Sequence, residues 1–436
     1  MTTSRDTSAL VVIPTRNRSN MAQNASRSVL CQPARNVNVL ISDNSTAPEE
    51  AESLARYCER LRDDRLHYVR PPKPLPMAQH WDWAMRHALQ TFDASHVIYL
   101  TDRMMFKRGE LQSVLDIART YPDKVITYYH DWIVDNDKPI TIEQNPWTGK
   151  LFEVDCQRLS YQYSKIHLHL CLPRMLNSLV PRNALDAVCA RFGNMFGSTS
   201  PDFNFGFRCL ELFDSFIYYD KSPIFHYGQA RSNGASMARG ERTRDHADFL
   251  AHCDARLNDA LPVPEMWTVG NAILHEYCVV KQQTNSARFY ELDRPRYLQY
   301  LSKEVEHVVN PELRAEMRTR LAAHGAVSDE VRRSSRTVSQ TMRKLLSPAA
   351  VLNKIGWTIR NIRWTMRNAT RSAATKHGWL FLARYFGMRL PADHRFQFDS
   401  VEEAIDFMQS FPRESAKEWP WQHELLRPRE NYPRFG

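Results

Sequence analysis

Short apolar runs alternate with longer amphipathic stretches over the first 130 residues of the chain. The apolar runs are rich in Val, Ile and Leu, and they predict strands at 10–14, 37–42, 66–69, 96–100 and 124–129. Between these runs, apolar residues recur at three- and four-residue spacing, which predicts helices at 19–30, 48–61, 77–89 and 109–121. The alternation is typical of an α/β fold with a Rossmann-like, mostly parallel sheet flanked by helices.

The pattern is less regular from 131 to 200, where a helix is expected near 183–192. A further helix begins around Asp202, and two short strands are expected at 216–219 and 224–227. In an open parallel sheet, ligands bind beyond the carboxyl ends of the strands. The residues that follow the first, second and fourth predicted strands are therefore where we look for chemistry.

A change of composition near Gly240 marks a candidate domain boundary. From 245 to about 323 the pattern is helical and rich in polar residues, so an α-helical C-terminal region is expected after the sheet. We therefore divide the chain into a sheet-containing domain at 1–245, a helical region at 246–330, a basic segment at 331–392 and a tail at 393–436.

The positive charge of the chain is concentrated in the basic segment. The formal net charge is +9, and the segment contains thirteen Lys or Arg residues and no Asp or Glu. Ile355, Ile359, Ile362 and Met366 share one side at helical spacing, which is typical of an amphipathic helix on an anionic membrane surface. Internal packing and binding to nucleic acid are alternatives, although no recognisable nucleic-acid module accompanies the segment.

The N-terminus lacks the pattern of a secretory signal, and no apolar stretch reaches the ~18 residues of a membrane-spanning helix. We expect a cytoplasmic protein that associates peripherally with the inner face of the membrane. The eight cysteines lie far apart, without the close pairs of a zinc or redox motif, so we expect free thiols.

Polar residues follow the first two predicted strands. The first strand leads into Pro14-Thr15-Arg16-Asn17-Arg18, and the second into Asp43-Asn44. The first loop offers backbone amides and cations for phosphate, and the second offers a carboxylate for a nucleobase or ribose, so the pair indicates a nucleotide site. Alternatively, Asp43 and Asn44 only cap a turn before the next helix.

The fourth predicted strand leads into Thr101-Asp102-Arg103, and a Met77-Ala-Gln-His-Trp-Asp-Trp-Ala84 motif precedes it. Together with the Pro-Thr-Arg-Asn-Arg and Ser-Asp-Asn-Ser loops, this ordered set resembles the nucleotide-binding half of GT-A glycosyltransferases of family 2. Those enzymes are inverting and depend on nucleotide sugars. The resemblance covers residues 9 to about 115 well and extends more loosely to about 240.

The resemblance implies that the first loop (Pro14, Thr15, Arg16 and Asn17), Asp43, His80, Asp102 and Arg103 bind the nucleotide sugar. It also implies that Asp102 reaches the ribose or a Mg²⁺ or Mn²⁺ ion. The family has a further carboxylate where this chain has Arg103. Two explanations stay open: Arg103 replaces the metal charge, since a guanidinium pairs with phosphate without an ion, or the site is catalytically weak.

On the acceptor side, the resemblance places the catalytic base at Asp202, at the start of a helix. Without it, Asp202 would be an ordinary first-turn carboxylate after the N-cap Ser200. His226 is a candidate metal ligand or a packed histidine. The expected function is transfer of a sugar to a glycan or lipid-linked acceptor with inversion, in cell-surface polysaccharide or glycan synthesis. The alternative is a weak or inactive nucleotide-sugar-binding scaffold.

Overall fold

The computed structural model describes residues 7–135, 138–143, 149–169, 171–197, 199–232, 234, 236, 260–264, 266–325 and 397–410. The basic segment at 331–392 lies outside these residues, so its helices and its membrane contact stay predictions. Of the helices that the structure describes, none has the length and hydrophobicity needed to cross a membrane.

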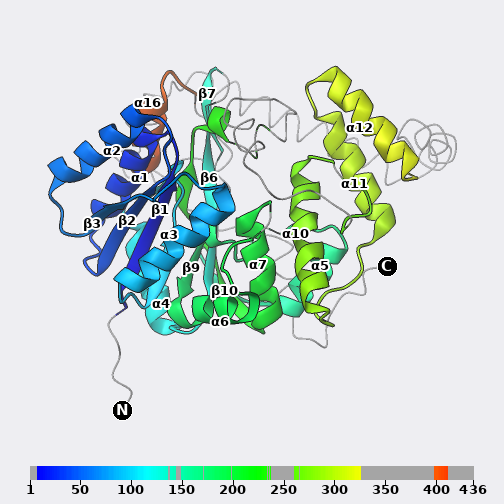
Figure 1. Cartoon of the computed structure of the whole chain (residues 1–436), viewed down its shortest axis with the longest axis horizontal. Coiled ribbons are helices and arrows are strands. Elements are labelled where there is room, and N and C mark those ends of the chain that lie inside the picture. Colours follow the sequence, from blue (N-terminus) through cyan, green and yellow to red (C-terminus); the bar gives the residue numbers. More distant parts are fainter. Residues whose placement is uncertain are drawn as a thin grey trace, which may run out of the picture.

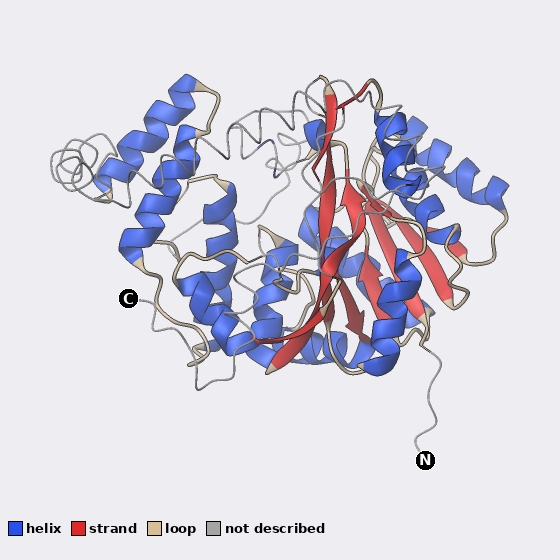
Figure 2. Cartoon of the chain, turned by 180° about the vertical axis from the view of Figure 1, so that it is seen from behind, coloured by secondary structure: helices blue, strands red, loops and turns tan. Residues whose placement is uncertain are grey.

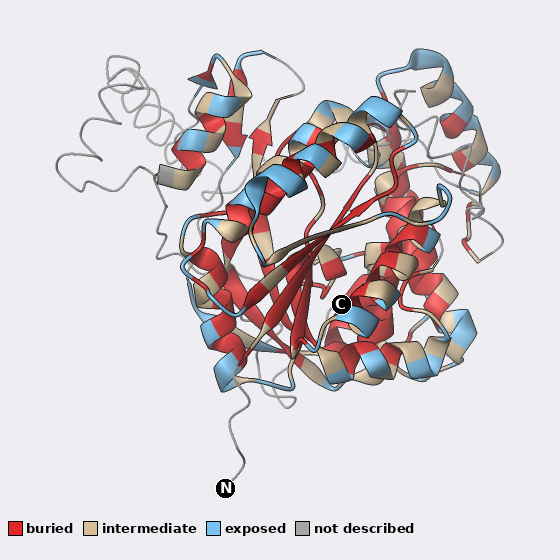
Figure 3. Cartoon of the chain, turned by 60° about the vertical axis from the view of Figure 1, so that its left-hand side comes forward, coloured by how far each residue is buried: buried red, intermediate tan, exposed pale blue. Residues whose placement is uncertain are grey.

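The N-terminal half of the sheet is parallel, as predicted. Its strands lie in the order β4, β1, β2, β3, with bounds His96–Tyr99, Ala9–Thr15, Val37–Asp43 and Leu66–Val69. All residues of β1 are buried, because its alternate side chains pack into two cores, one on each face of the sheet. Figure 3 shows the sheet as the buried centre of the molecule.

Helices cover both faces of this parallel half (Figure 1). They are α1 (Ser19–Leu30), α2 (Pro48–Leu61), α3 (Met77–Thr91) and α4 (Glu110–Thr120). The apolar residues of α1, α2 and α4 enter one core and those of α3 enter the other. Helix α2 begins with Pro48, followed by two glutamates in its first turn, which is a favourable N-terminus. The helix and strand predictions for this half are confirmed.

The second half of the sheet is mixed, and β9 (Ser178–Pro181) links it to the first. Strand β9 pairs antiparallel with both β4 and β6 (Ile126–Val134). Further strands are β5 (Met104–Phe106), β7 (Ile140–Glu143) and β8 (Leu151–Asp155). The region from 131 to 200, in which the sequence pattern predicted no strand, thus supplies β7, β8 and β9.

A single long strand, β10 (Ser215–His226), replaces the two short strands predicted at 216–219 and 224–227. It runs parallel to β6, and the register shifts between Tyr219 and Ile224. Pro223 lies in this irregular stretch, where a residue without an N–H is tolerated. Strand β10 therefore ends beside β6, with His226 at its carboxyl end.

The C-terminal helices stand beside this mixed half (Figures 1 and 2). Helices α5 (Cys156–Ser164), α6 (Arg182–Phe192) and α7 (Pro201–Leu212) precede α10 (Val269–Thr284), α11 (Arg294–Glu306) and α12 (Pro311–Ala323). Short 3₁₀ turns lie at Met175–Asn177 (η1) and Gln229–Arg231 (η2). Helix α10 packs along α7 and thereby joins the C-terminal helices to the sheet-containing domain.

Residues near the C-terminus return to the sheet. Strand β11 (Gln397–Phe398) pairs antiparallel with β7, and α16 (Val401–Ser410) packs beside it. The side chain of Gln409 donates to the carbonyl oxygen of Phe106 at 2.8 Å. The last described helix therefore contacts the strand that follows the Asp102 loop.

Candidate functional site

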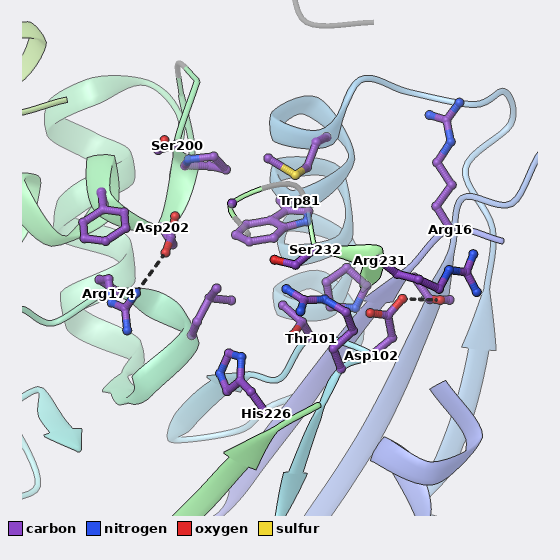
Figure 4. Close-up of a pocket in the computed structure, with 18 of the residues that line it drawn as sticks. Arg16, Trp81, Thr101, Asp102, Arg174, Ser200, Asp202, His226, Arg231 and Ser232 are labelled. Atoms are coloured by element: carbon purple, nitrogen blue, oxygen red, sulfur yellow. Dashed lines mark hydrogen bonds and ion pairs between the residues drawn. The ribbon is translucent and has the colours of Figure 1, made fainter. Parts of the chain in front are cut away.

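A cavity of about 590 Å³ lies at the carboxyl ends of the strands. The loops after β1 and β4 form one wall, the first turns of α7 and α10 form the opposite wall, and the ends of β6 and β10 form the floor. Figure 4 shows Asp102 and Arg231 on one side, Asp202 and Arg174 on the other, and His226 between them. The cavity brings together most of the residues that the sequence singled out.

Asp102 is held by the loop that follows β1. The hydroxyl of Thr15 donates to its Oδ2 atom at 2.9 Å, and Arg18 Nη1 lies 3.4 Å from its Oδ1 atom. Asp102 is only 2% exposed, yet it lines the cavity. The pairing of β1 with β4 thus places Thr15 and Asp102, which are far apart in sequence, at one point.

Two arginines cross-link the loop after β1 to the loop after β10. Arg18 Nη2 donates to the carbonyl oxygen of Arg231 at 2.7 Å, and Arg231 Nη2 donates to that of Asn17 at 2.8 Å. Both arginines line the cavity, together with Arg16 and Arg103. This wall therefore offers several positive charges to an anionic ligand.

Asn17 links the loop after β1 to the loop between β2 and α2 through hydrogen bonds. Its backbone is left-handed at φ 54°, and its Oδ1 atom accepts the backbone N–H groups of Thr46 and Ala47, each at 2.9 Å. These contacts fix the entry to α2. Asn17 lines the cavity next to Pro14 and Thr15, and its contact with a nucleotide stays a prediction.

Asp43 is fully buried and is not among the residues that line the cavity. Its Oδ1 atom accepts the backbone N–H of Ser45 at 2.8 Å, and its Oδ2 atom accepts the hydroxyl of Tyr68 at 2.8 Å. Arg70 Nε lies 3.5 Å from the same oxygen. Asp43 thus forms the turn contact that the alternative interpretation foresaw, and its role as a nucleotide ligand stays a prediction.

His80 on α3 lines the cavity and is 3% exposed. Its Nε2 atom lies 2.9 Å from the hydroxyl of Ser42 on β2. Burial, assisted by the positive charge of Arg16, lowers the pKa of His80 to about 3. His80 is therefore a neutral hydrogen-bonding group at physiological pH.

Asp202 lies in the first turn of α7, after Pro201, and its side chain is 14% exposed. Arg174 Nη1 lies 3.7 Å from its Oδ2 atom, and the Arg174 guanidinium also stacks on Phe203. Burial raises the pKa of Asp202; the charge of Arg174 opposes this shift and that of Glu276 adds to it. Once ionised, such a carboxylate is a stronger base than an exposed one.

Glu276 of α10 fixes the backbone that leads into Asp202. Its Oε1 atom accepts the backbone N–H groups of Thr199 and Ser200 at 3.0 and 2.7 Å, and its Oε2 atom accepts the side chain of Asn204. Glu276 is fully buried. Glu276 therefore anchors Thr199 and Ser200, the two residues that precede α7, to α10.

The floor of the cavity contains His226 from β10 and His130 and Trp132 from β6. The rings of His130 and His226 are stacked with centroids 4.0 Å apart. Burial and the nearby charges of Arg103 and Arg174 hold the pKa of both histidines well below the usual value. His226 is thus packed against aromatic rings.

The donor groups around Asp102 do not fit a divalent metal ion. Its neighbours are a hydroxyl and the guanidinium of Arg18, and Arg103 follows it in sequence. Within the described part of the chain, no group of three or more His, Cys, Asp or Glu side chains is arranged to hold a metal. Mg²⁺ and Mn²⁺ prefer several oxygen ligands, so we assign no step to a metal.

Some functional candidates were missed in the sequence. Arg174 and His130 carry no local motif, since their role depends on contacts with residues distant in the chain. His130 and Trp132 continue the alternation of the strand predicted at 124–129, so extending that strand would have found them.

The α/β sheet, parallel in its N-terminal half and flanked by helices, agrees with the GT-A fold expected from the sequence. Residues 10–175 match the family described as Glycosyl transferase family 2. The resemblance seen in the sequence is therefore confirmed over these residues, which make up less than half of the chain.

Solved structures of S. aureus TarS are similar to the chain at low identity. The match to one TarS structure covers 73% of this chain and 53% of the TarS chain, with 12% identity and a TM-score of 0.38. This chain therefore spans about half the length of that protein. TarS 1–349 in complex with UDP-GlcNAc covers 75% of this chain and 92% of its own, with 11% identity and a TM-score of 0.41. Comparison with curated protein sequences found no match.

Proposed function

We propose that the protein transfers a sugar from a nucleoside diphosphate sugar to a hydroxyl group of a glycan or lipid-linked acceptor, with inversion at the anomeric carbon. The observation that carries the proposal is one cavity with Asp102 and its arginines at one end and a partly buried Asp202 at the other. The family match supports the donor class. A role in polysaccharide or glycan synthesis follows from the acceptor class.

The proposed reaction is a single displacement. Asp202 takes the proton of the acceptor hydroxyl while its oxygen forms a bond to the anomeric carbon. The bond from that carbon to the diphosphate oxygen breaks, and its electron pair leaves with the nucleoside diphosphate. Since attack and departure occur on opposite faces, the configuration inverts.

We further propose that arginines supply the positive charge that the leaving diphosphate requires. Arg16, Arg18, Arg103 and Arg231 line the cavity beside Asp102, and a guanidinium can pair with two phosphate oxygens. Charge fixed in place before the reaction stabilises a leaving anion without reorganisation. The protein should then retain activity when divalent metals are removed.

The first experiment is calorimetry of the full chain with UDP, GDP, dTDP and CMP, each with Mg²⁺, with Mn²⁺ and with EDTA. We expect one nucleotide to bind, and to bind in EDTA as well. Binding that requires a metal would contradict the arginine proposal. No binding of any nucleotide would contradict the donor class itself.

The second experiment tests the base. Asp202→Asn should lower transfer by at least about 100-fold, because general base catalysis is worth roughly 10²–10⁴-fold, while nucleotide affinity stays unchanged. Asp186→Asn, which alters an exposed carboxylate on α6, is the matched control. Turnover of Asp202→Asn equal to that of the control would reject Asp202 as the base.

A second candidate function is a catalytically inactive scaffold. It is favoured by Arg103, which stands where the family has a carboxylate. A nucleotide-sugar-binding scaffold would bind a nucleotide but form no product with any donor and acceptor. Product formation with one donor rejects the scaffold.

A further inference from the structure

Two buried histidines in the cavity floor have no task in the chemistry described above. His130 is 2% exposed and His226 is 5% exposed. Their rings stack at a centroid distance of 4.0 Å and an interplanar angle of 30°. The Trp132 ring lies 4.7 Å from His130 and 4.6 Å from His226, so the three rings form one cluster.

The pairing of β6 with β10 builds this cluster. Trp132 is directly opposite His226 in the parallel register, so both side chains leave the same face of the sheet. His130, two residues before Trp132, shares that face. Because all three residues belong to strands of the central sheet, their positions are fixed without a ligand.

None of the four ring nitrogens of His130 and His226 has a hydrogen-bond partner among the residues that the structure describes. Buried polar atoms are nearly always hydrogen-bonded, so two adjacent exceptions require an explanation. Both residues line the cavity. A ligand in the cavity would be within reach as a partner for these nitrogens.

The charge state of the pair limits the chemistry of this ligand. Burial and the nearby guanidinium groups keep both imidazoles neutral. A neutral imidazole has one N–H donor and one nitrogen acceptor, so the pair presents two donors and two acceptors. A hydroxyl group both donates and accepts, whereas a phosphate or carboxylate would leave both acceptor nitrogens facing an anion.

We propose that His130, His226 and Trp132 form the subsite that binds the hydroxyl groups of the transferred sugar and thereby selects the donor sugar. The inference rests on the proposed function. His226 lies between Asp102 and Asp202 in Figure 4, which is where the sugar must sit to connect the diphosphate with the attacking acceptor.

The test compares a nucleotide with its own sugar conjugates. After the nucleotide screen, the nucleotide that binds is titrated beside its glucose, galactose, mannose and N-acetylglucosamine conjugates. His226→Phe and His130→Phe should each weaken the preferred conjugate about tenfold, the loss expected for hydrogen bonds worth about 1.4 kcal/mol, and leave the free nucleotide unchanged. His226→Gln, which retains a donor and an acceptor, should restore part of the affinity.

His96→Phe is the matched control, because His96 is another buried histidine but does not line the cavity. His96→Phe should change neither the affinity for the free nucleotide nor that for the sugar conjugate. If the ratio of the affinities for the conjugate and for the free nucleotide is the same in the Phe variants as in the wild-type protein, the sugar subsite is overturned while the proposed function stands. If the wild-type protein binds no nucleotide, the proposed function fails first.

A measurement on the wild-type protein covers the case in which the Phe variants do not fold. Ring-¹⁵N NMR of histidine-labelled protein should show two imidazoles whose signals move with the sugar conjugate and not with the free nucleotide. Spectra of His226→Gln and His130→Gln assign these two signals, because each variant lacks one of them. Identical spectra with nucleotide and conjugate would overturn the subsite.

Discussion

Asp202 lies between charges of opposite sign, and their balance sets its strength as a base. Arg174 lies 3.7 Å from the carboxylate and favours its ionised form, whereas Glu276 and burial favour the protonated form. A base acts only when ionised, so proposed transfer should fail as the pH falls through the pKa of Asp202. The pH at which activity falls on the acid side of the kcat/KM profile, its acid limb, therefore depends on the charges around Asp202.

Replacing Arg174 by Met should move the acid limb of the kcat/KM profile upward by about one pH unit or more. The reason is that loss of the positive charge raises the pKa of Asp202 further. Arg174→Lys keeps the charge and should leave the limb close to its wild-type position. A limb that moves to lower pH in Arg174→Met would contradict the charge balance described here.

Asp43 illustrates what a sequence motif leaves undetermined at the scale of one residue. The motif located the strand end correctly, but the partners of Asp43 include Tyr68 and Arg70, which follow from the pairing of β2 with β3. The environment of a side chain depends on such long-range contacts. For Asp102 the contact with Thr15 likewise follows from a strand pairing, that of β1 with β4, whereas the sequence indicated only that both residues follow predicted strands.

At the scale of elements, α10 positions the start of α7 through Glu276. Glu276→Gln should lower the free energy of unfolding by about 1–3 kcal/mol, because charge-assisted hydrogen bonds to the backbone before α7 and to Asn204 are lost. It should also move the acid limb of the pH profile to lower pH, since a negative charge near Asp202 disappears. Chemical denaturation and the kcat/KM profile measure the two effects.

Glu304→Gln is the control for this prediction. Glu304 accepts the N–H of Gly270 and the hydroxyl of Thr268, so it caps α10 in a comparable way. It is not among the residues that shift the pKa of Asp202. The control should therefore lose stability without a shift of the acid limb, and equal shifts in both variants would refute the specific role of Glu276.

Packing against Leu172 explains why a glycine, Gly206, stands in the middle of α7. A Cβ atom at this position would lie 2.8 Å from Cγ of Leu172, a fully packed core residue. Gly206→Ala should therefore destabilise the protein by about 1–3 kcal/mol, despite the better helix propensity of alanine. Thermal or urea unfolding measures the loss.

The coupling between these two positions can be checked with Leu172→Ala. The double variant should be less destabilised than the sum of the two single variants, because each substitution relieves the defect of the other. Strict additivity would show that the Cβ atom and Leu172 do not compete for space.

Sequence patterns located the elements of the parallel half well because each has one clear period. Helices α1 and α2 have the predicted bounds, since apolar spacing is clear in both and Pro48 marks the start of α2. Strand β10 was divided in two because Asp220, Lys221 and Pro223 interrupt its apolar pattern. Strand β9 has only four residues, too few to establish a period.

At the scale of the whole molecule, the basic segment at 331–392 connects two parts that the structure describes. Helix α12 precedes it, and β11 follows it on the sheet edge. We propose that the segment binds the anionic inner face of a membrane peripherally. Its cations would each contribute about 1 kcal/mol near such a surface.

The full chain should sediment with phosphatidylserine vesicles but not with phosphatidylcholine vesicles, and added salt should release it. Replacing Arg360, Arg363 and Arg367 by Gln should weaken this binding more than tenfold. The same replacement of Arg56, Arg60 and Arg62, on and just after α2, is the control. Equal binding to both vesicles would contradict the electrostatic attachment.

The pairing of β7 with β11 has a consequence for biosynthesis. Strand β7 ends at Glu143, and its partner begins at Gln397, so 254 residues (397 − 143) must be synthesised before the edge is covered. At about 5–20 residues per second, the nascent chain carries an open strand edge for roughly 13–50 s. An open edge invites pairing with other chains, so the yield of folded protein should depend on how fast translation reaches β11.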